Sequence, residues 1–175
     1  MPEARHPAWA RWLGISVAVA VLDLATKAWV SAVFAPGEVL VLTPFLNFVL
    51  WHNPGAAFSF LAGAGGWQRW FFVAVTVVIS AVLVAMLRKS GDNRILATAL
   101  SLVLGGAAGN LWDRVTLGHV VDFIQVHAAG YYWPAFNVAD SAITVGVALI
   151  VWDGFRDARA AQAGRGAPGN SAASK

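Results

Sequence analysis

Two aspartates stand at the ends of a short polar and aromatic stretch that separates two apolar runs. Asp122 follows two valines, and Asp140 comes three residues after Asn137 and opens the last long apolar run. A carboxylate at the edge of hydrocarbon is costly unless it is paired or used. Two carboxyl groups held close together share one proton, because both do not ionise easily. The pattern therefore predicts an acid–base pair at a membrane surface.

Such a pair can catalyse the addition of water to a carbonyl group with its two carboxyl groups alone. The ionised carboxylate takes a proton from water, and the protonated one donates a hydrogen bond to the scissile carbonyl. The sequence does not tell which aspartate begins as the base. No metal, nucleotide or covalent intermediate is needed, so no cofactor is expected. His52, His119 and His127 do not form an H-E-x-x-H motif or a comparable cluster, and no zinc site is predicted.

The composition indicates an integral membrane protein. Of the 175 residues 58% are hydrophobic and only 12% are charged, whereas soluble domains carry about 25% charged residues. The chain has no cysteine, which excludes disulfides, thiolate metal sites and a cysteine nucleophile. No basic stretch is interleaved with aromatic residues, so nucleic acid is not an expected partner.

Four apolar segments have the length of membrane spans. A bilayer core of roughly 30 Å needs about 20 helical residues, and helices are predicted at 12–34, 67–87, 95–112 and 138–152. The first is longer than the apolar core of a signal peptide and contains charged residues, so it is predicted to be a retained helix. The fourth is short and is expected either to thin the bilayer locally or to start below the outer interface. Residues 1–157 then form one domain, and the small, Gly-rich tail 158–175 is predicted to be disordered.

The basic residues predict the orientation. They gather before the first span, between the second and third, and after the fourth: Arg5, Arg11, Arg88, Lys89, Arg94, Arg156, Arg159, Arg165 and Lys175. The positive-inside rule places both termini and the 88–94 loop in the cytoplasm. The stretches 35–66 and 113–138, and with them both aspartates, are then expected outside.

The outer stretch 35–66 is rich in β-branched and aromatic residues. Residues 39–51, with a turn at Thr43–Pro44, predict a short hairpin or small sheet at the interface. Residues 52–55 predict a turn, and 56–61 are expected to return toward the membrane. The predicted fold is an all-α membrane protein of four transmembrane helices, with a small β-rich extracytoplasmic segment between the first and second helices.

Polar residues inside the first and third spans each allow a structural explanation beside a functional one. Asp23 and Lys27 lie one helical turn apart, so they either neutralise each other or position substrate and catalytic groups. Gly105 and Gly109 form a G-x-x-x-G pattern, which favours close helix packing. Asn110 continues the same helix face.

Three further residues, Asp113, Arg114 and Asn137, lie close to the ends of the third and fourth spans. Arg114 continues the face of Asn110, and Asp113 beside it is expected to be its interfacial ion partner. Asn137 and Asp140 have the spacing of a helix cap followed by an acid in the first turn. The hypothesis for Asn137 is that it also serves the acid pair or the substrate.

Five blocks together resemble one family. They are Asp23-x-x-Thr-Lys27, NPGAAFS at 53–59, GGAAGNLWDR at 105–114, VVDF at 120–123 and FNVAD at 136–140. In this order across four spans, covering about residues 12–153, they resemble lipoprotein signal peptidase, the bacterial type II signal peptidase. Leu24–Ala25 stands where a glutamine is common in the family, and the C-terminal tail resembles nothing in particular.

The resemblance implies an aspartic endopeptidase of the bacterial inner membrane, with its site on the extracytoplasmic side and without metal or cofactor. It removes signal peptides from prolipoproteins just before a diacylglyceryl-modified cysteine, so its expected partners are these precursors and membrane lipids. The resemblance also implies that Asp122 and Asp140 are catalytic, and that 35–66 holds the family's outer β-rich cradle and mobile amphipathic segment. The residues it implies for substrate binding or for shaping the site are Asp23, Lys27, Asn53, Gly55, Gly109, Asn110, Arg114 and Asn137.

Two other classes of protein use similar features. Proton-coupled transporters and channel subunits also carry intramembrane carboxylates, but they need polar groups spread through the membrane depth. Here these groups cluster at the outer ends of the third and fourth spans. A scaffold bundle packed through Gly105 and Gly109 would need none of the acids.

Overall fold

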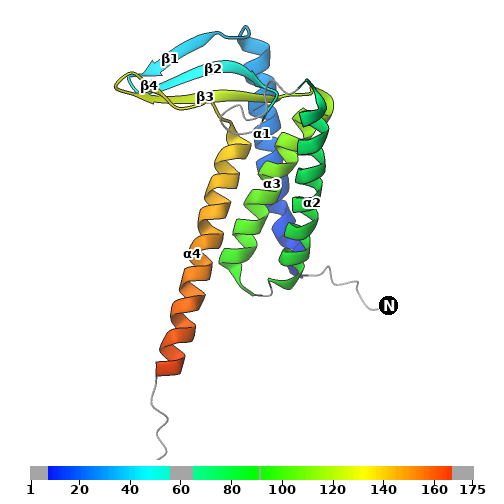
Figure 1. Ribbon diagram of the computed structural model, residues 1–175, viewed down its shortest axis with the longest axis vertical. Helices are drawn as coiled ribbons and strands as arrows, with labels where there is room; N and C mark the ends of the chain where they lie inside the picture. The colour runs from blue at the N-terminus through cyan, green and yellow to red at the C-terminus, as the bar shows by residue number, and fades with distance from the viewer. Residues whose placement is uncertain (1–7, 56–64, 91, 167–175) are drawn as a thin grey trace, which may run out of the picture.

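Four helices form a bundle with a small sheet across one end (Figure 1). The computed structural model describes residues 8–55, 65–90 and 92–166. A short 3-10 turn, Ala8–Trp12, leads into α1 (Leu13–Val33), and α2 (Trp67–Lys89), α3 (Arg94–Thr116) and α4 (Val138–Gly166) follow. All four are long and apolar enough to cross a membrane. The four predicted spans are therefore confirmed.

The sheet has four antiparallel strands in the order β1-β2-β3-β4. β1 (Val39–Thr43) and β2 (Leu46–Asn53) form the predicted hairpin around a turn at 44–45. The turn predicted at 52–55 begins later, because His52 and Asn53 still pair with β3. The predicted return segment 56–61 lies outside the described residues.

Half of the sheet comes from a part of the chain where no strand was predicted. β3 (Val120–Ala128) and β4 (Tyr131–Tyr132) lie between α3 and α4. β3 pairs with β2 over most of its length, with Trp51 opposite Asp122 and Asn53 opposite Val120. Pairing with a distant strand turns this stretch into a sheet element, and it carries one of the two aspartates.

The fourth helix is longer than predicted. It continues to Gly166, so the predicted end at 152 and the predicted disorder of 158–166 are wrong. Residues 158–163 are Ala, Arg and Gln, which are strong helix formers despite their polar character. In the same helix, the Asp153 side chain accepts hydrogen bonds from Asn93 at 2.7 Å and from Arg156 at 2.8 Å. The Asn93 bond joins α4 to the start of α3.

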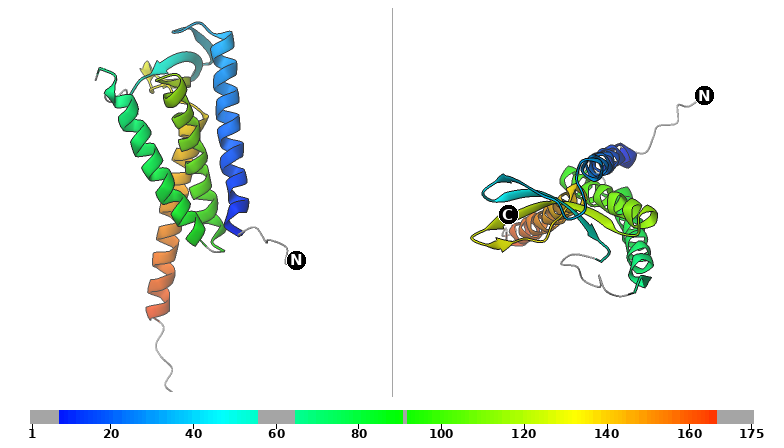
Figure 2. Two further views of the ribbon diagram at one scale, coloured as in Figure 1. Left: turned by 90° about the vertical axis from the view of Figure 1, so that its right-hand side faces the viewer. Right: turned by 90° about the horizontal axis from the view of Figure 1, so that it is seen from above.

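α3 occupies the centre of the bundle, and α1, α2 and α4 pack around it (Figure 2). Of its most apolar stretch 56% is buried, against 22% or less in the other three helices. A Cβ added at Gly105 would come within 2.7 Å of the Ser16 carbonyl oxygen of α1, and one at Gly109 would collide with Asp23. A Cβ added at Gly106 would collide with the backbone of Ala139 in α4. The predicted close packing through G-x-x-x-G is confirmed.

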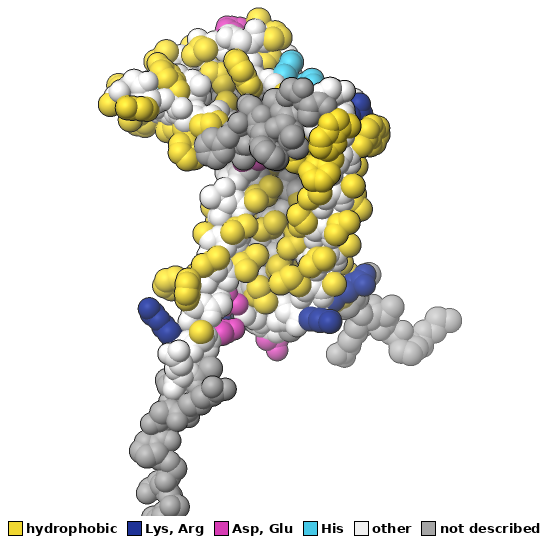
Figure 3. Space-filling model, viewed as in Figure 1, with side chains coloured by type: hydrophobic (Ala, Val, Ile, Leu, Met, Phe, Trp, Pro, Cys, Tyr) yellow, Lys and Arg dark blue, Asp and Glu magenta, His cyan; other side chains and the backbone are white. Residues whose placement is uncertain are grey.

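Apolar side chains cover the outside of the bundle, as lipid contact requires (Figure 3). On the face drawn there, most Lys and Arg side chains lie at the end opposite the sheet. α1 and α3 end at the sheet, and α2 and α4 begin there. The sheet and the start of α4 therefore meet at one end of the bundle.

Candidate active site

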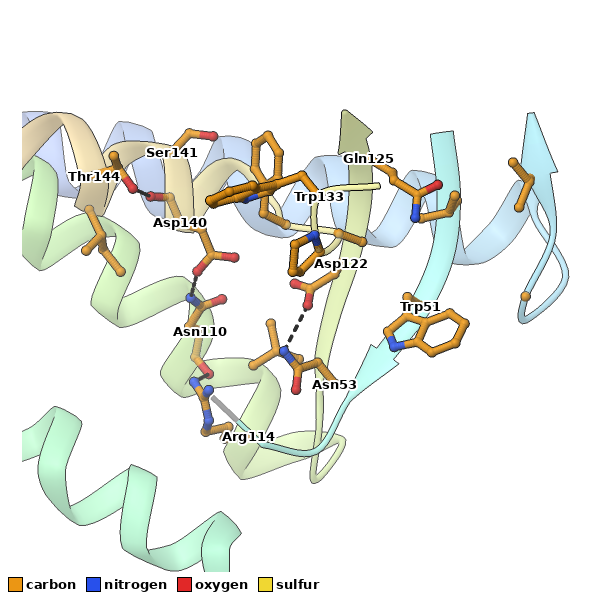
Figure 4. A pocket seen from close by; sticks show the side chains of 18 of the residues that line it. Trp51, Asn53, Asn110, Arg114, Asp122, Gln125, Trp133, Asp140, Ser141 and Thr144 are labelled. Atoms are coloured by element: carbon orange, nitrogen blue, oxygen red, sulfur yellow. Dashed lines mark hydrogen bonds between the residues drawn. The ribbon is translucent and has the colours of Figure 1, made fainter. Parts of the chain in front are cut away.

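Asp122 and Asp140 line one cavity of about 890 Å³ between the sheet and the adjoining ends of α3 and α4 (Figure 4). Asp122 comes from β3 and Asp140 from the first turn of α4. The rest of the wall is largely apolar and aromatic, with Val39, Val49, Trp51, Trp133, Pro134, Phe136, Ile143 and Val145. The fold thus brings the two predicted acids to the same cavity.

Asp122 is only 2% exposed, and amide groups hold both of its carboxyl oxygens. Asn53 Nδ2 donates to Oδ2 at 3.1 Å, and Asn137 Nδ2 donates to Oδ1 at 2.8 Å. Burial, followed by the charge of Asp140, raises the pKa of Asp122 to about 7, although the Asn53 hydrogen bond opposes this. Asp122 therefore keeps its proton far above the pH at which an ordinary aspartate loses it.

Asp140 is held by the neighbouring Asn residues. Asn110 Nδ2 donates to Oδ1 at 2.8 Å, and the backbone N–H of Asn137 donates to Oδ2 at 3.3 Å. In return the Asn137 side-chain oxygen accepts the backbone N–H of Asp140 at 2.9 Å. This reciprocal arrangement is a helix cap, so the predicted capping is confirmed. Asn137 therefore contacts both acids: its side-chain amide donates to the Asp122 carboxyl group, and its backbone N–H donates to the Asp140 carboxylate.

A buried cation lies behind the cavity. Lys27 Nζ contacts Asp23 Oδ2 at 2.7 Å, Asp113 Oδ2 at 3.0 Å and Asn110 Oδ1 at 2.9 Å. The predicted neutralisation of Asp23 by Lys27 is confirmed. The ion partner of Asp113 is Lys27, so its predicted pairing with Arg114 is wrong; consecutive helix residues point in different directions, and Asp113 faces α1. Asp23 also accepts the backbone N–H of Ala139 at 2.8 Å, which fixes the start of α4.

Arg114 holds the end of β2 against α3. Its guanidinium donates to the Gly55 carbonyl oxygen at 3.1 Å and to the Asn110 carbonyl oxygen at 3.3 Å, and it lies over the Phe72 ring at 5.3 Å. The Gly55 N–H in turn bonds the Asn53 side-chain oxygen at 3.0 Å. Arg114 thereby supports the Asn53 amide that reaches Asp122.

The predicted site residues divide into two groups. Asn53, Asn110 and Arg114 line the cavity with the two aspartates. Asp23, Lys27, Gly109 and Asn137 lie behind them, and Gly55 acts through its backbone. Sequence reasoning did not find Trp51, Gln125 and Trp133, which also line the cavity. The aromatic residues at 131–133 were a signal of a binding surface. Because β3 was not predicted, the sequence did not indicate that they lie near the acids.

The histidines do not form a metal site in the described part of the chain. Within residues 8–55, 65–90 and 92–166, no three His, Asp or Glu side chains converge on a position for a metal ion. The His52 and His119 rings instead lie against each other, with centroids 4.2 Å apart and an angle of 31° between the ring planes. Burial, followed by the nearby His52, lowers the pKa of His119.

Four membrane-length helices with two carboxyl groups in one cavity define a membrane protein equipped for acid–base hydrolysis. Residues 15–156 match the family described as signal peptidase (SPase) II. The chain belongs to this family of membrane aspartic peptidases.

Named relatives and solved structures agree with this assignment. A lipoprotein signal peptidase of Paraburkholderia phymatum is 50% identical over 153 residues, covering 87% of this chain and 92% of the relative. Another from Burkholderia mallei is 49% identical over 155 residues, covering 89% and 93%. A bacterial membrane enzyme solved in meso at 2.3 Å matches with a TM-score of 0.78 and 36% identity, over 85% of this chain and 90% of that one. A second, solved at 1.9 Å, has a TM-score of 0.73 and 37% identity, over 82% and 92%.

Proposed function

We propose that the chain removes signal peptides from prolipoproteins by cleaving just before the diacylglyceryl-modified cysteine, with Asp122 and Asp140 as the catalytic pair. The observation that carries this is the shared cavity of the two acids, linked through Asn137. Family membership and the names of the relatives supply the substrate class. Membership also favours a peptidase over a proton-coupled transporter or channel subunit.

The reaction needs one proton on the pair. Because the pKa of Asp122 is raised to about 7, Asp122 holds this proton and donates a hydrogen bond to the scissile carbonyl oxygen. Asp140 takes a proton from water, and the hydroxide adds to the carbonyl carbon. When the tetrahedral centre collapses, Asp140 returns its proton to the leaving nitrogen. Asn110 and Asn137 keep the Asp140 carboxylate in place through both steps.

The remaining site residues support this geometry. Asn53 bonds Asp122, and Arg114 holds the strand end from which Asn53 projects. Lys27 forms ion pairs with both Asp23 and Asp113 behind the cavity, and Gly109 leaves room for Asp23. None of these residues replaces a member of the pair in a proton transfer.

The lipid on the substrate accounts for a site at the membrane surface. Each buried CH₂ contributes about 0.8 kcal/mol to membrane attachment, so an acylated precursor does not leave the bilayer readily. The apolar wall that includes Val39, Val49 and Ile143 suits a lipid-linked peptide. We place the protein in the bacterial inner membrane, with the cavity on the extracytoplasmic side and both termini in the cytoplasm.

Cleavage of a diacylglyceryl-modified precursor by purified variants tests the proposal. Asp122→Asn and Asp140→Asn should each reduce turnover by several orders of magnitude. The double variant should be scarcely worse than either, since groups that act as a unit are non-additive. Asp153→Asn is a matched control, because Asp153 is also buried but lies where α4 meets the start of α3, away from the cavity.

Two results would contradict this assignment. Substantial cleavage by either single variant would remove that aspartate from the catalytic pair. Loss of precursor binding together with cleavage would make the acids structural or substrate-holding groups instead.

A further inference from the structure

A second polar network lies on the sheet, away from the acid pair. Asn47 of β2 is 3% exposed and stands opposite Gln125 of β3. Its amide nitrogen donates to Gln125 Oε1 at 3.1 Å, and His127 Nε2 lies 3.2 Å from its oxygen. The His127 ring stacks on Tyr132, with centroids 5.0 Å apart. The acid pair uses none of these contacts.

This network determines which way the side-chain amide of Gln125 is turned. With His127 protonated at Nε2, its N–H donates to Asn47 Oδ1, and the Asn47 amide nitrogen is left to face Gln125. Gln125 accepts that bond with its oxygen, so its own NH₂ group is free to point elsewhere. Gln125 lines the cavity, and among the described residues none accepts a hydrogen bond from its amide nitrogen. The chain His127–Asn47–Gln125 thus presents an N–H donor to the cavity.

The position of this donor relative to the acids follows from the strand. A strand rises about 3.3 Å per residue, so Gln125 lies about 10 Å along β3 from Asp122. Figure 4 shows both residues at the cavity, with Trp133 and Trp51 labelled in its wall. Gln125 is half-buried, so water reaches its N–H in the free protein. A ligand that displaces this water must supply an acceptor, because a desolvated N–H without a partner is costly.

We propose that Gln125 is a specificity-determining residue whose side-chain N–H donates to a carbonyl oxygen of the bound precursor, at a part of the cavity wall three residues along β3 from Asp122. This inference rests on the proposed function and deepens it. Two kinds of carbonyl satisfy the chemistry: an ester carbonyl of the diacylglyceryl group, or a peptide carbonyl near the cleavage site. The donor recognises the same oxygen type in both cases.

The test compares two synthetic precursors with the full-length enzyme. One carries a diacylglyceryl group, and the other carries the dialkyl ether analogue, which has the same chains and no ester carbonyls. Gln125→Met keeps the length and removes the donor; Gln125→Glu keeps the oxygen that Asn47 bonds and turns the donor into an acceptor. The matched control is Gln162→Met, on an exposed position of α4. Thermal unfolding checks that each variant is folded.

The expected effect is on KM. Loss of one neutral hydrogen bond corresponds to about a 2- to 10-fold change, so Gln125→Met should raise KM by that factor with kcat nearly unchanged. Gln125→Glu should raise KM further, because two acceptors then face each other. A rise with the diacyl precursor alone assigns the ester carbonyl, and an equal rise with both precursors assigns a peptide carbonyl.

An unchanged KM for both precursors would overturn the inference. Gln125→Glu carries the test alone if Gln125→Met does not fold. The proposed function is judged separately, since it requires that the unmodified enzyme cleaves the diacyl precursor and that Asp122→Asn does not. Failure of the Gln125 effect with those two results intact would remove only this subsite.

Discussion

Amide side chains, with their fixed donor and acceptor ends, organise the acid pair. The Asn110 oxygen faces the Lys27 ammonium at 2.9 Å, which leaves its amide nitrogen to donate to Asp140 at 2.8 Å. The Asn137 amide donates to Asp122 at 2.8 Å, while its oxygen caps α4. Neither aspartate contacts the buried cation directly among the described hydrogen bonds and ion pairs. The Asn110 amide therefore lies between Lys27 and Asp140 and orients the Asp140 carboxylate.

The raised pKa of Asp122 predicts a pH dependence of stability. The pKa is about 7 in the folded protein against 3.8 ordinarily, so between these values the folded state binds more protons than the unfolded state. The free energy of unfolding therefore falls as pH rises from about 4 to 7 and is level above that. The shift corresponds to a contribution on the order of 4 kcal/mol. Asp122→Asn, which does not titrate, should remove this part of the slope.

Denaturant unfolding in detergent at pH 5 and pH 8 measures this effect. Asp122→Asn should gain stability relative to the unmodified chain at both pH values, and the gain at pH 5 should be roughly a third of that at pH 8. Asp153→Asn, where α4 meets the start of α3, provides the comparison for a buried aspartate outside the cavity. An equal difference at both pH values would mean that Asp122 does not carry the shifted proton.

At the level of elements, local sequence patterns predicted the helices and the first hairpin but not the sheet as a whole. Apolar length alone defines the spans. β3 is different, because its residues become a strand only by pairing with β2, some seventy residues earlier. The same limit applies to the site: the asparagines around the acids were predicted, whereas Gln125, Trp51 and Trp133 depend on β3 and on the chain that returns from it. Local reasoning predicted the Asp23–Lys27 ion pair within one helix, but it missed the partner of Asp113, which lies on another helix.

The contact between α1 and α3 predicts unequal effects of two Gly→Ala changes. A Cβ at Gly109 would collide with the Asp23 carboxylate that pairs with Lys27, whereas at Gly14 it would meet nothing within 4 Å. Gly14→Ala should leave stability unchanged or raise it by up to about 1 kcal/mol, since Ala is the better helix former. Gly109→Ala should lower stability by about 1–3 kcal/mol, because overpacking forces the helices apart.

Precursor cleavage and thermal unfolding of both variants check this pair of expectations. Gly109→Ala should also lose activity, since displacement of Asp23 disturbs the start of α4 through the Ala139 N–H. Equal behaviour of Gly109→Ala and Gly14→Ala would show that the helices separate without cost at this point.

At the scale of the whole molecule, the two aspartates of the cavity and the basic residues of the α2–α3 connection lie at opposite ends of the bundle. The cavity and the sheet are at the end where α1 ends and α4 begins, and the α2–α3 connection lies at the other end (Figure 1). Arg88, Lys89 and Arg94 flank that connection. From the positive-inside rule we propose that this end faces the cytoplasm and that the cavity opens on the outer side.

This orientation predicts opposite labelling of two introduced cysteines. The chain has no cysteine of its own, so single-cysteine variants give an unambiguous signal with a membrane-impermeant maleimide. Phe45→Cys lies in the β1–β2 turn at a position 59% exposed, and Asp92→Cys lies in the exposed α2–α3 connection. In spheroplasts Phe45→Cys should react at once, whereas Asp92→Cys should react only after the membrane is permeabilised. Labelling of Asp92→Cys in intact spheroplasts, with Phe45→Cys protected, would invert the topology and put both aspartates on the cytoplasmic side, where an exported precursor does not present its cleavage site.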